Sequence, residues 1–330
     1  MFNMRAAGLS IVGLAILASL TSCAGGPTSL PMQTGSAAVV SCRLPVTNFA
    51  RNGGSSSSQN GFISIPSGSF TPDATGDGGS YDAAYGKWVP VPRAFLLPDG
   101  SAYVMELQAP DSHYEIHLVQ VASAADKVIL QMPYDNAYSV LALRPEGIYL
   151  VPLLHRSGLP QGLWLLTATT ATITEIAGAG NLAWRLIDGG GAWGSPVGVD
   201  RLDRLDLSTG VVTTWFEHPV QPPIGIGSGY GPDIVAFDRS QRPLVELYPP
   251  AAAGAAPLPE LWLASGPGQA TRLTGMPLTD RLLTPGMTDR HGTWLVGSDG
   301  FYLYTDSGFK RAAPNPPGPV GEFQIAGGCA

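Results

Sequence analysis

The chain has 330 residues, of which 44% are hydrophobic, so it can bury a large core and is not expected to be disordered. Only 13% of the residues are charged, and glycine (42) and proline (30) are abundant, which favours many short strands joined by tight turns over long charged helices. The formal net charge of −7 and the lack of a Lys/Arg cluster argue against nucleic acid as a partner and against electrostatic docking on anionic lipid.

The first 22 residues have the parts of an export leader. Arg5 supplies a positive charge, and residues 6–20 form an apolar run too short for a comfortable membrane span of about 20 residues. The segment Leu20-Thr21-Ser22-Cys23 resembles the lipobox of bacterial lipoproteins, in which an aliphatic residue and two small residues precede a cysteine. The resemblance implies that the leader is cut before Cys23 and that this residue is lipidated. A cleaved leader with a free cysteine and an uncleaved anchor helix are the alternatives.

These features predict three parts, namely a signal peptide (1–22), a flexible tether (23–41) and one folded domain (42–330). The tether is small, polar and without periodicity, as linkers are. We expect a monomer on the outer face of a bacterial membrane, either at the cell surface or on the periplasmic side. Its membrane attachment would be through lipidated Cys23, and more than one acyl chain anchors stably because each buried CH₂ contributes about 0.8 kcal/mol.

The two cysteines beyond Cys23 are Cys42, at the start of the predicted domain, and Cys329, close to its end. Disulfides persist in exported proteins, so we predict that these two cysteines are bridged, with two unpaired thiols as the alternative. A bridge requires the two ends of the domain to be neighbours.

A hairpin pattern recurs six times along the domain. Alternating apolar residues lead into a Gly/Ser/Thr/Asp turn, after which the alternation resumes. The copies lie at residues 61–70, 116–121, 162–176, 205–212, 260–274 and 300–311. From Ser64 to Leu303 the average interval is about 48 residues, and a period of this length with four strand-like runs per unit is typical of a β-propeller.

Two turn motifs carry a family resemblance. Leu97-Pro98-Asp99-Gly100 and Leu143-Arg144-Pro145-Glu146-Gly147 are similar to the WD40-like repeat of TolB-type periplasmic proteins. The run from Asp289 to Gly300 resembles the repeat of two-component-regulator propellers. The resemblance covers roughly Gly61 to Ala313 and implies a fold rather than a function. We predict an all-β protein with a single propeller of six four-stranded blades, with seven blades as the alternative.

The ring is expected to close with strands from both ends of the domain. If the strands of a blade are named A to D from the centre outward, residues 321–326 form a lone A strand and residues 42–46 a B strand. The runs around Phe62 and Phe70 are then C and D. Neighbouring A and B strands would place Cys329 beside Cys42.

Candidate chemistry is sparse in this sequence, and we expect no cofactor and no metal. The histidines lack a metal-ligand spacing, since His113 and His117 are expected on a loop and a strand. Residues 225–231 partly match a dinucleotide fingerprint, but a strand rather than a helix follows them. Asp73, Asp77 and Asp82 could hold Ca²⁺, although a solvated turn is the favoured interpretation.

Propellers usually bind on the face built from D–A and B–C loops around the central channel, and aromatic and Arg residues there suit a binding hot spot. Ordinary loop residues are the alternative. The candidate binding residues on that face are Tyr134, Asp135, His155, Arg156, Trp184, Arg185, Tyr230, Asp233, Asp280 and Arg281.

The resulting hypothesis is a non-catalytic, surface-tethered module that binds a protein, peptide or glycan. The alternative is a lyase or hydrolase at the channel mouth that uses His155 or His218 with a nearby Asp or Arg, and a structural envelope role comes third. An enzyme requires a histidine and a carboxylate within about 3 Å, whereas a binding module can present a broad aromatic patch without such a pair.

Overall fold

The computed structural model describes residues 40–52, 55–76, 78–110, 113–153, 162–180, 182–188, 190–196, 199, 201–218, 232–248, 259–278, 285–317 and 322–330. They belong to one compact unit, Val39–Ala330. The predicted signal peptide and Cys23 lie outside the described residues, as does nearly all of the predicted tether. Among the described residues, no helix has the length and apolar character needed to cross a membrane.

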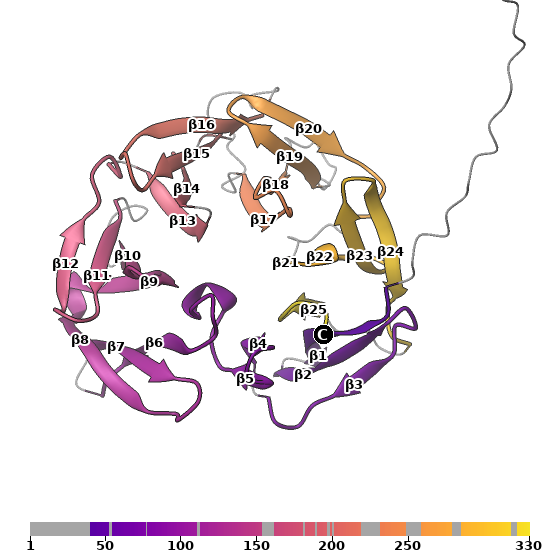
Figure 1. Ribbon diagram of the computed structural model, residues 1–330, viewed down its shortest axis with the longest axis horizontal. Coiled ribbons are helices and arrows are strands. Elements are labelled where there is room, and N and C mark those ends of the chain that lie inside the picture. The colour runs from indigo at the N-terminus through magenta and orange to yellow at the C-terminus, as the bar shows by residue number, and fades with distance from the viewer. Residues whose placement is uncertain are drawn as a thin grey trace, which may run out of the picture. The chain divides into compact units, whose positions relative to one another are not determined.

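The described strands form five four-stranded sheets, one three-stranded sheet and one two-stranded sheet. Figure 1 shows them arranged around a common centre, with β9, β13, β17, β21 and β25 innermost and β3, β12, β16, β20 and β24 outermost. A sheet that packs both faces against its neighbours in a ring leaves only its short edges open. The unit is therefore a single β-propeller, as predicted.

Six blades make up the ring. From the centre outward, blade 1 contains β25 (Glu322–Ile325), β1 (Cys42–Asn52), β2 (Ser55–Ile65) and β3 (Phe70–Pro72). Blade 2 contains β6 (Ala102–Gln108), β7 (His113–Gln120) and β8 (Asp126–Pro133). Its inner edge is extended by the isolated bridge between Leu96 and Tyr103, next to the short 3-10 helix η1 (Arg93–Phe95).

Blades 3 to 6 each have four strands. Blade 3 contains β9 (Tyr138–Arg144), β10 (Gly147–Pro152), β11 (Trp164–Thr167) and β12 (Thr172–Glu175). Blade 4 contains β13 (Ala183–Asp188), β14 (Gly191–Ser195), β15 (Arg201–Asp206) and β16 (Val212–Glu217). Blade 5 contains β17 (Asp233–Phe237), β18 (Pro243–Leu247), β19 (Glu260–Gly266) and β20 (Gln269–Leu273). Blade 6 contains β21 (Met287–Asp289), β22 (Gly292–Gly297), β23 (Gly300–Thr305) and β24 (Gly308–Pro314).

Blade 1 closes the ring with strands from both ends of the domain. β25 pairs antiparallel with β1, with Val46 opposite Ile325 and Phe49 opposite Glu322. β1 in turn pairs with β2, and β2 with β3. The predicted assignment of these four segments to positions A, B, C and D is confirmed.

The predicted disulfide is confirmed as well. Cys42 and Cys329 are bridged across a sequence separation of 287 residues, with their Cα atoms 5.7 Å apart. Beside the bridge, the backbones of Arg43 and Ala330 exchange two hydrogen bonds of 3.1 Å. The two ends of the domain are therefore joined covalently and by backbone pairing.

The cores lie between the blades, because each sheet is apolar on both faces. One cluster joins blades 6 and 1 around Trp294, which is fully buried, and includes Leu44, Ile63, Phe301 and Phe323. Similar clusters lie between the other consecutive blades from 2 to 6. The tryptophans that recur in the repeat, Trp164, Trp262 and Trp294, all pack in or against these clusters, as predicted.

A hairpin of β4 (Ser80–Asp82) and β5 (Lys87–Val89) is inserted between blades 1 and 2. The ring centroid of Phe62 on β2 lies 5.1 Å from the ring centroid of Tyr81 and 5.9 Å from that of Trp88. Asp82 is only 3% exposed, so the prediction of a solvated acidic turn is wrong for this residue. Asp73 accepts a hydrogen bond of 3.1 Å from the Trp88 indole instead of facing solvent freely. Asp77 lies outside the described residues.

The burial of Asp82 depends on Gly100. The carboxylate packs directly against this glycine, where a Cβ would meet the Asp82 Oδ2 atom at 2.1 Å. Gly100 also has a φ of +75°, which favours glycine at the end of the predicted Pro-Asp-Gly turn. Among the described residues, no group of three or more His, Cys, Asp or Glu side chains is arranged to hold a metal ion.

Candidate functional site

The D–A and B–C connections lie at one end of the propeller, and part of the predicted binding face falls within the described residues. Tyr134, Asp135, Trp184, Arg185 and Asp233 are described. The other candidates, His155, Arg156, Tyr230, Asp280 and Arg281, lie outside the described residues, as do the glycines of the partial dinucleotide match.

Tyr134 and Asp135 lie on the short 3-10 helix η2 (Tyr134–Asn136), which connects blade 2 to blade 3. Pro133 precedes it with a φ of −65°, the value that the proline ring imposes. Tyr134 is 42% exposed and stacks on Tyr114, with ring centroids 5.6 Å apart and an interplanar angle of 22°. The proline and the stacked partner fix the position of an exposed aromatic ring.

A second aromatic pair lies on the adjoining blade. The rings of Tyr138 and Trp164 are 5.3 Å apart, and both side chains are half-buried. Met132 connects the two pairs, because it lies opposite Tyr114 in the sheet and its sulfur accepts the Tyr138 N–H. We call Tyr114, Tyr134, Tyr138 and Trp164 the aromatic patch. Rigid tyrosine and tryptophan rings supply contact area at a low cost in side-chain entropy.

The other described candidates are dispersed over the inner strands of blades 4 and 5. Trp184 is 3% exposed and donates its indole N–H to the Ala179 carbonyl at 2.9 Å, so its ring is part of the core between blades 3 and 4. Arg185 is exposed at a register shift of β13. Asp233 is exposed at the start of β17, where its carboxylate accepts the Ile234 N–H. Of the five candidates that the structure describes, Tyr134 and Asp135 are the two that lie at exposed aromatic surface.

His218, named for the alternative enzyme, does lie near a carboxylate. Its Nε2 atom is 3.5 Å from Glu260 Oε2, and the side chain is 5% exposed. The same carboxylate accepts the Trp262 indole N–H at 3.0 Å and pairs with Arg272 at 3.2 Å. A distance of 3.5 Å is longer than a general base needs, and the carboxylate already serves two closer donors. Glu260 thus joins His218, Trp262 and Arg272 in one polar network, and His155 lies outside the described residues.

A polar cluster on blade 2 was missed at the level of sequence. His113 Nε2 lies 2.9 Å from one Glu115 oxygen, and His117 Nε2 lies 3.1 Å from the other. The second ring nitrogen of His117 faces Asp126 at 2.9 Å, and Gln131 donates to Glu115 at 2.7 Å. Residues two apart in a strand share a face, so the strand alternation of His113, Glu115 and His117 was the available signal.

The cluster changes the acidity of its members. Hydrogen bonds from His113, Gln131 and His117 lower the pKa of Glu115 to about 2. Burial by itself would lower the pKa of His117, but its hydrogen bonds with Asp126 and Glu115 outweigh burial and raise it. A neutral imidazole has one N–H, whereas both His117 nitrogens face carboxylates, so the arrangement favours the doubly protonated ring.

Neither a scan against protein-family models nor a search of curated proteins found a match to this chain. Among solved structures, the chain is similar to TolB from Acinetobacter baumannii, at 13% identity and a TM-score of 0.44, covering 86% of this chain and 67% of TolB. It is also similar to an acylaminoacyl peptidase from Pyrococcus horikoshii, at 10% identity and a TM-score of 0.46, covering 84% of this chain.

A further acylaminoacyl peptidase structure, in complex with Z-Gly-Gly-Phe-chloromethyl ketone, has 10% identity, a TM-score of 0.44 and 82% coverage of this chain. The chain spans 46% of the length of each peptidase. Similarity at this level says nothing about activity, and the propeller fold rests on the strand order and the packing between blades.

Proposed function

We propose that this protein is an exported, lipid-anchored propeller that binds a protein, peptide or glycan through the aromatic patch. Export is supported by the Cys42–Cys329 disulfide, because such bridges persist in oxidising compartments. Anchoring is supported by the lipobox resemblance around Cys23.

The observation that carries the binding role is the stacked Tyr134–Tyr114 pair. A ring that is 42% exposed and held by a partner at 5.6 Å contributes little to the core, yet it is rigid. Preorganised aromatic rings dominate binding interfaces, because a partner gains apolar contact without ordering them. Asp135, beside Tyr134 on η2, adds a carboxylate at the edge of the patch.

The alternative of a lyase or hydrolase has no comparable support among the described residues. The histidine that it would use, His218, is 5% exposed, and the Glu260 carboxylate that it faces is shared with Trp262 and Arg272. The proposal is therefore a binding module and not an enzyme.

The test compares two tyrosines of matched exposure. Tyr134 is 42% exposed in the aromatic patch, and Tyr85 is 40% exposed on the turn between β4 and β5. The full chain and its Tyr134→Ala and Tyr85→Ala variants are applied to arrays of defined glycans and peptides. We expect the wild-type protein and Tyr85→Ala to retain the same ligands and Tyr134→Ala to lose them. Equal binding by both variants, or no ligand for the wild-type protein on either array, would refute the role of the patch.

Lipidation is tested separately by the Cys23→Ala substitution. Cells that express the wild-type chain or this variant are labelled with radioactive palmitate. We expect label on the wild-type protein alone, with the variant released from the membrane fraction. Label on both proteins, or on neither, would contradict anchoring through Cys23.

A further inference from the structure

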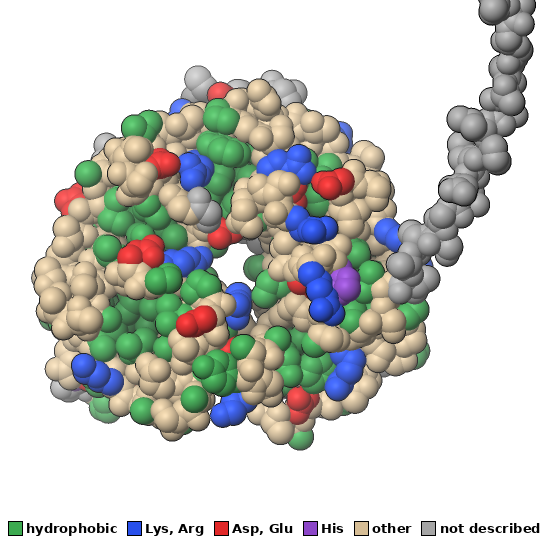
Figure 2. All heavy atoms as spheres, in the orientation of Figure 1, with side chains coloured by type: hydrophobic (Ala, Val, Ile, Leu, Met, Phe, Trp, Pro, Cys, Tyr) green, Lys and Arg blue, Asp and Glu red, His purple; other side chains and the backbone are tan. Residues whose placement is uncertain are grey.

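Two arginines lie on the wall of the central channel, at the end where A strands turn into B strands. Arg93 begins η1, whose coiled ribbon projects toward the centre of the ring in Figure 1. Arg144 ends β9, the innermost strand of blade 3. Its Nη1 atom lies 3.5 Å from the Ala94 carbonyl, so the two side chains share one stretch of wall. Figure 2 shows an opening at the centre of the propeller, with Lys or Arg side chains beside it.

The guanidinium of Arg144 is held by backbone carbonyls from three blades. It donates to Leu143 of its own blade at 2.8 Å, to Ala94 of blade 2 and to Ile187 of blade 4. Carbonyl oxygens satisfy its N–H groups but bring no negative charge. Arg144 is thus a fixed positive charge at the channel wall.

The Arg93 side chain is exposed and makes few polar contacts. Its one polar contact with the described residues is the Pro98 carbonyl at 3.5 Å, and neither Arg93 nor Arg144 forms an ion pair with a described carboxylate. Four or more of the N–H donors of Arg93 are therefore available to a ligand.

The surrounding protein disfavours the charged forms of Arg93 and Arg144. Desolvation by the surrounding protein lowers the pKa of Arg93, the charge of Arg144 lowers it further, and Asp82 partly offsets both. Desolvation also lowers the pKa of Arg144, against the opposing effect of Asp188 and Glu146. Both residues belong to segments that border the centre of the ring, namely η1 and the innermost strand β9. Two neighbouring cations there favour an anion between them, because Coulomb interactions are strong where water is scarce.

Three described carboxylates, Asp82, Asp188 and Glu146, act on these charges from nearby, and none of the three forms an ion pair with Arg93 or Arg144. Asp82 is buried; its Oδ1 atom accepts the Ala84 N–H at 2.9 Å, and its Oδ2 atom has no hydrogen-bond partner among the described residues. Glu146 accepts the Tyr149 hydroxyl at 2.8 Å. The planar fork of a guanidinium matches the two oxygens of a carboxylate, which makes a carboxylate the fitting anion.

We propose that Arg93 and Arg144 form a carboxylate-binding site in the central channel, in which the Arg93 guanidinium donates hydrogen bonds to both oxygens of the ligand. The site lies at the end of the propeller opposite to the aromatic patch. It does not depend on the function proposed for that patch.

The probe is succinate, with succinamide as the uncharged analogue of the same shape. The full chain, labelled with ¹⁵N-arginine, is titrated with each compound at a constant ionic strength of about 0.15 M, so that general screening does not change. The arginine Nε–H signals are followed by NMR, and Kd is measured by calorimetry. Arg93→Gln removes the fork, and Arg290→Gln is the matched control, because Arg290 is an exposed arginine on the A–B turn of blade 6.

We expect saturable binding of succinate and none of succinamide. The Arg93→Gln variant should bind about tenfold more weakly or worse, the scale of one lost charge-assisted pair, while Arg290→Gln binds as the wild-type protein does. If Arg93→Gln does not fold, Arg93→Lys keeps the charge without the fork and should still weaken binding. Unsaturable succinate shifts, equal losses in the two glutamine variants, or equal binding of succinamide would overturn the proposal.

Discussion

The two interfaces on either side of blade 1 are built in different ways. The closing interface, between blades 6 and 1, has a continuous apolar cluster around Trp294, the pairing of β25 with β1, and the Cys42–Cys329 disulfide. The hairpin interface, between blades 1 and 2, is filled by the β4–β5 hairpin and a small apolar cluster. On its blade 2 side, Met105 of that cluster lies opposite His117 of the polar cluster.

The difference follows chain connectivity. Residues 73–95 run from blade 1 into blade 2, so the backbone itself keeps the hairpin interface together. Residues 315–321 likewise run from β24 of blade 6 into β25 of blade 1. The two ends of the domain meet inside blade 1, between β25 and β1, and there the fold supplies a covalent bond and strand pairing. The ring is therefore reinforced where its first and last strands meet, beside the apolar cluster that joins blades 6 and 1.

Among the changes that test this comparison, removing the disulfide should lower the free energy of unfolding most. The Cys42→Ala/Cys329→Ala double variant loses a crosslink across 287 residues, which the chain-entropy model equates with up to about 5 kcal/mol of unfolding free energy. Urea denaturation measures the loss, with Cys23→Ala as a cysteine variant that leaves the bridge intact. A double variant as stable as Cys23→Ala would show that the strand pairing and core close the ring unaided.

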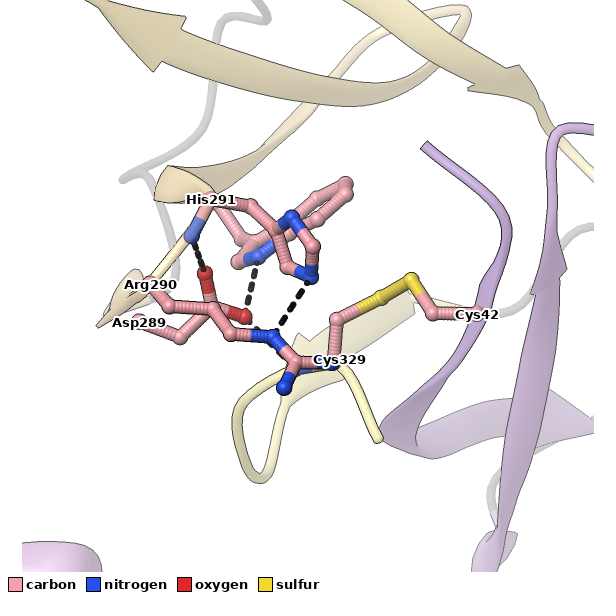
Figure 3. Close-up of a disulfide and its surroundings, with 6 residues drawn as sticks. Cys42, Asp289, Arg290, His291 and Cys329 are labelled. Atoms are coloured by element: carbon pink, nitrogen blue, oxygen red, sulfur yellow. Dashed lines mark hydrogen bonds between the residues drawn. A yellow bond between two sulfur atoms is a disulfide. The ribbon is translucent and has the colours of Figure 1, made fainter. Parts of the chain in front are cut away.

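The Asp289 carboxylate is the next most important contact of the closing interface. Figure 3 shows it between His291 and Cys329, whose backbone N–H groups it accepts at 2.7 Å each. It also accepts the indole N–H of fully buried Trp294 at 2.8 Å. Replacing Asp289 by alanine leaves these donors unpaired and should cost about 2–3 kcal/mol.

The control for this substitution is Asp306→Ala, because the Asp306 side chain is 98% exposed. We expect it to change stability by less than about 0.5 kcal/mol in the same urea series. If both alanine variants were equally stable, the three hydrogen bonds of Asp289 would contribute nothing to closure.

The smallest expected effect is a pH dependence confined to the hairpin interface. The raised pKa of His117 means that its stabilisation is complete below the unfolded value of 6.5 and is lost as pH rises through the folded value. Glu115, lowered from 4.5 to about 2, stabilises fully above pH 4.5 and loses its contribution as pH falls. The cluster of His113, Glu115, His117 and Asp126 should therefore contribute most between about pH 4.5 and 6.5.

The measurement is the urea midpoint of the wild-type protein and of His117→Gln across pH 3 to 9. We expect the difference between the two to peak in that window and to shrink on both sides. Tyr103, Lys87 and Gln131 are the other polar groups near the cluster. Burial raises the pKa of Tyr103 further above this window, and the Gln131 amide does not ionise. His291→Gln, a histidine variant at the closing interface, should show no such peak, and a peak in both variants would assign the effect to something other than the cluster.

Much of the closing interface could be predicted from the sequence. Two cysteines near opposite ends of the domain and a repeat of about 48 residues independently require a closed ring. Turn residues and alternation are local signals, so the hairpins at Trp164, Trp262 and Phe301 were also visible. The strand order of blade 1 then followed from closure.

The hairpin interface and the candidate site were less predictable, because they depend on contacts between distant residues. The sequence around Asp82 predicts an exposed loop residue, and its burial depends on its contact with Gly100, which no local pattern indicates. Trp184 lacks a place in the repeat, yet it is 3% exposed and so more deeply buried than Trp164 and Trp262, which do recur. The sequence likewise contains no sign that Tyr134 stacks on Tyr114, since the two residues are brought together by the pairing of β7 with β8.

The position of β25 in the chain also determines when blade 1 can be completed during synthesis. Blade 1 cannot be completed until residues 322–329 have been synthesised, although its other three strands are among the first to emerge. Cys42 must wait as a thiol for that whole interval, and the only other cysteine made before its partner is Cys23. If Cys23 is acylated, as its sequence context predicts, the chain loses its one possible mispairing before the correct bridge can form.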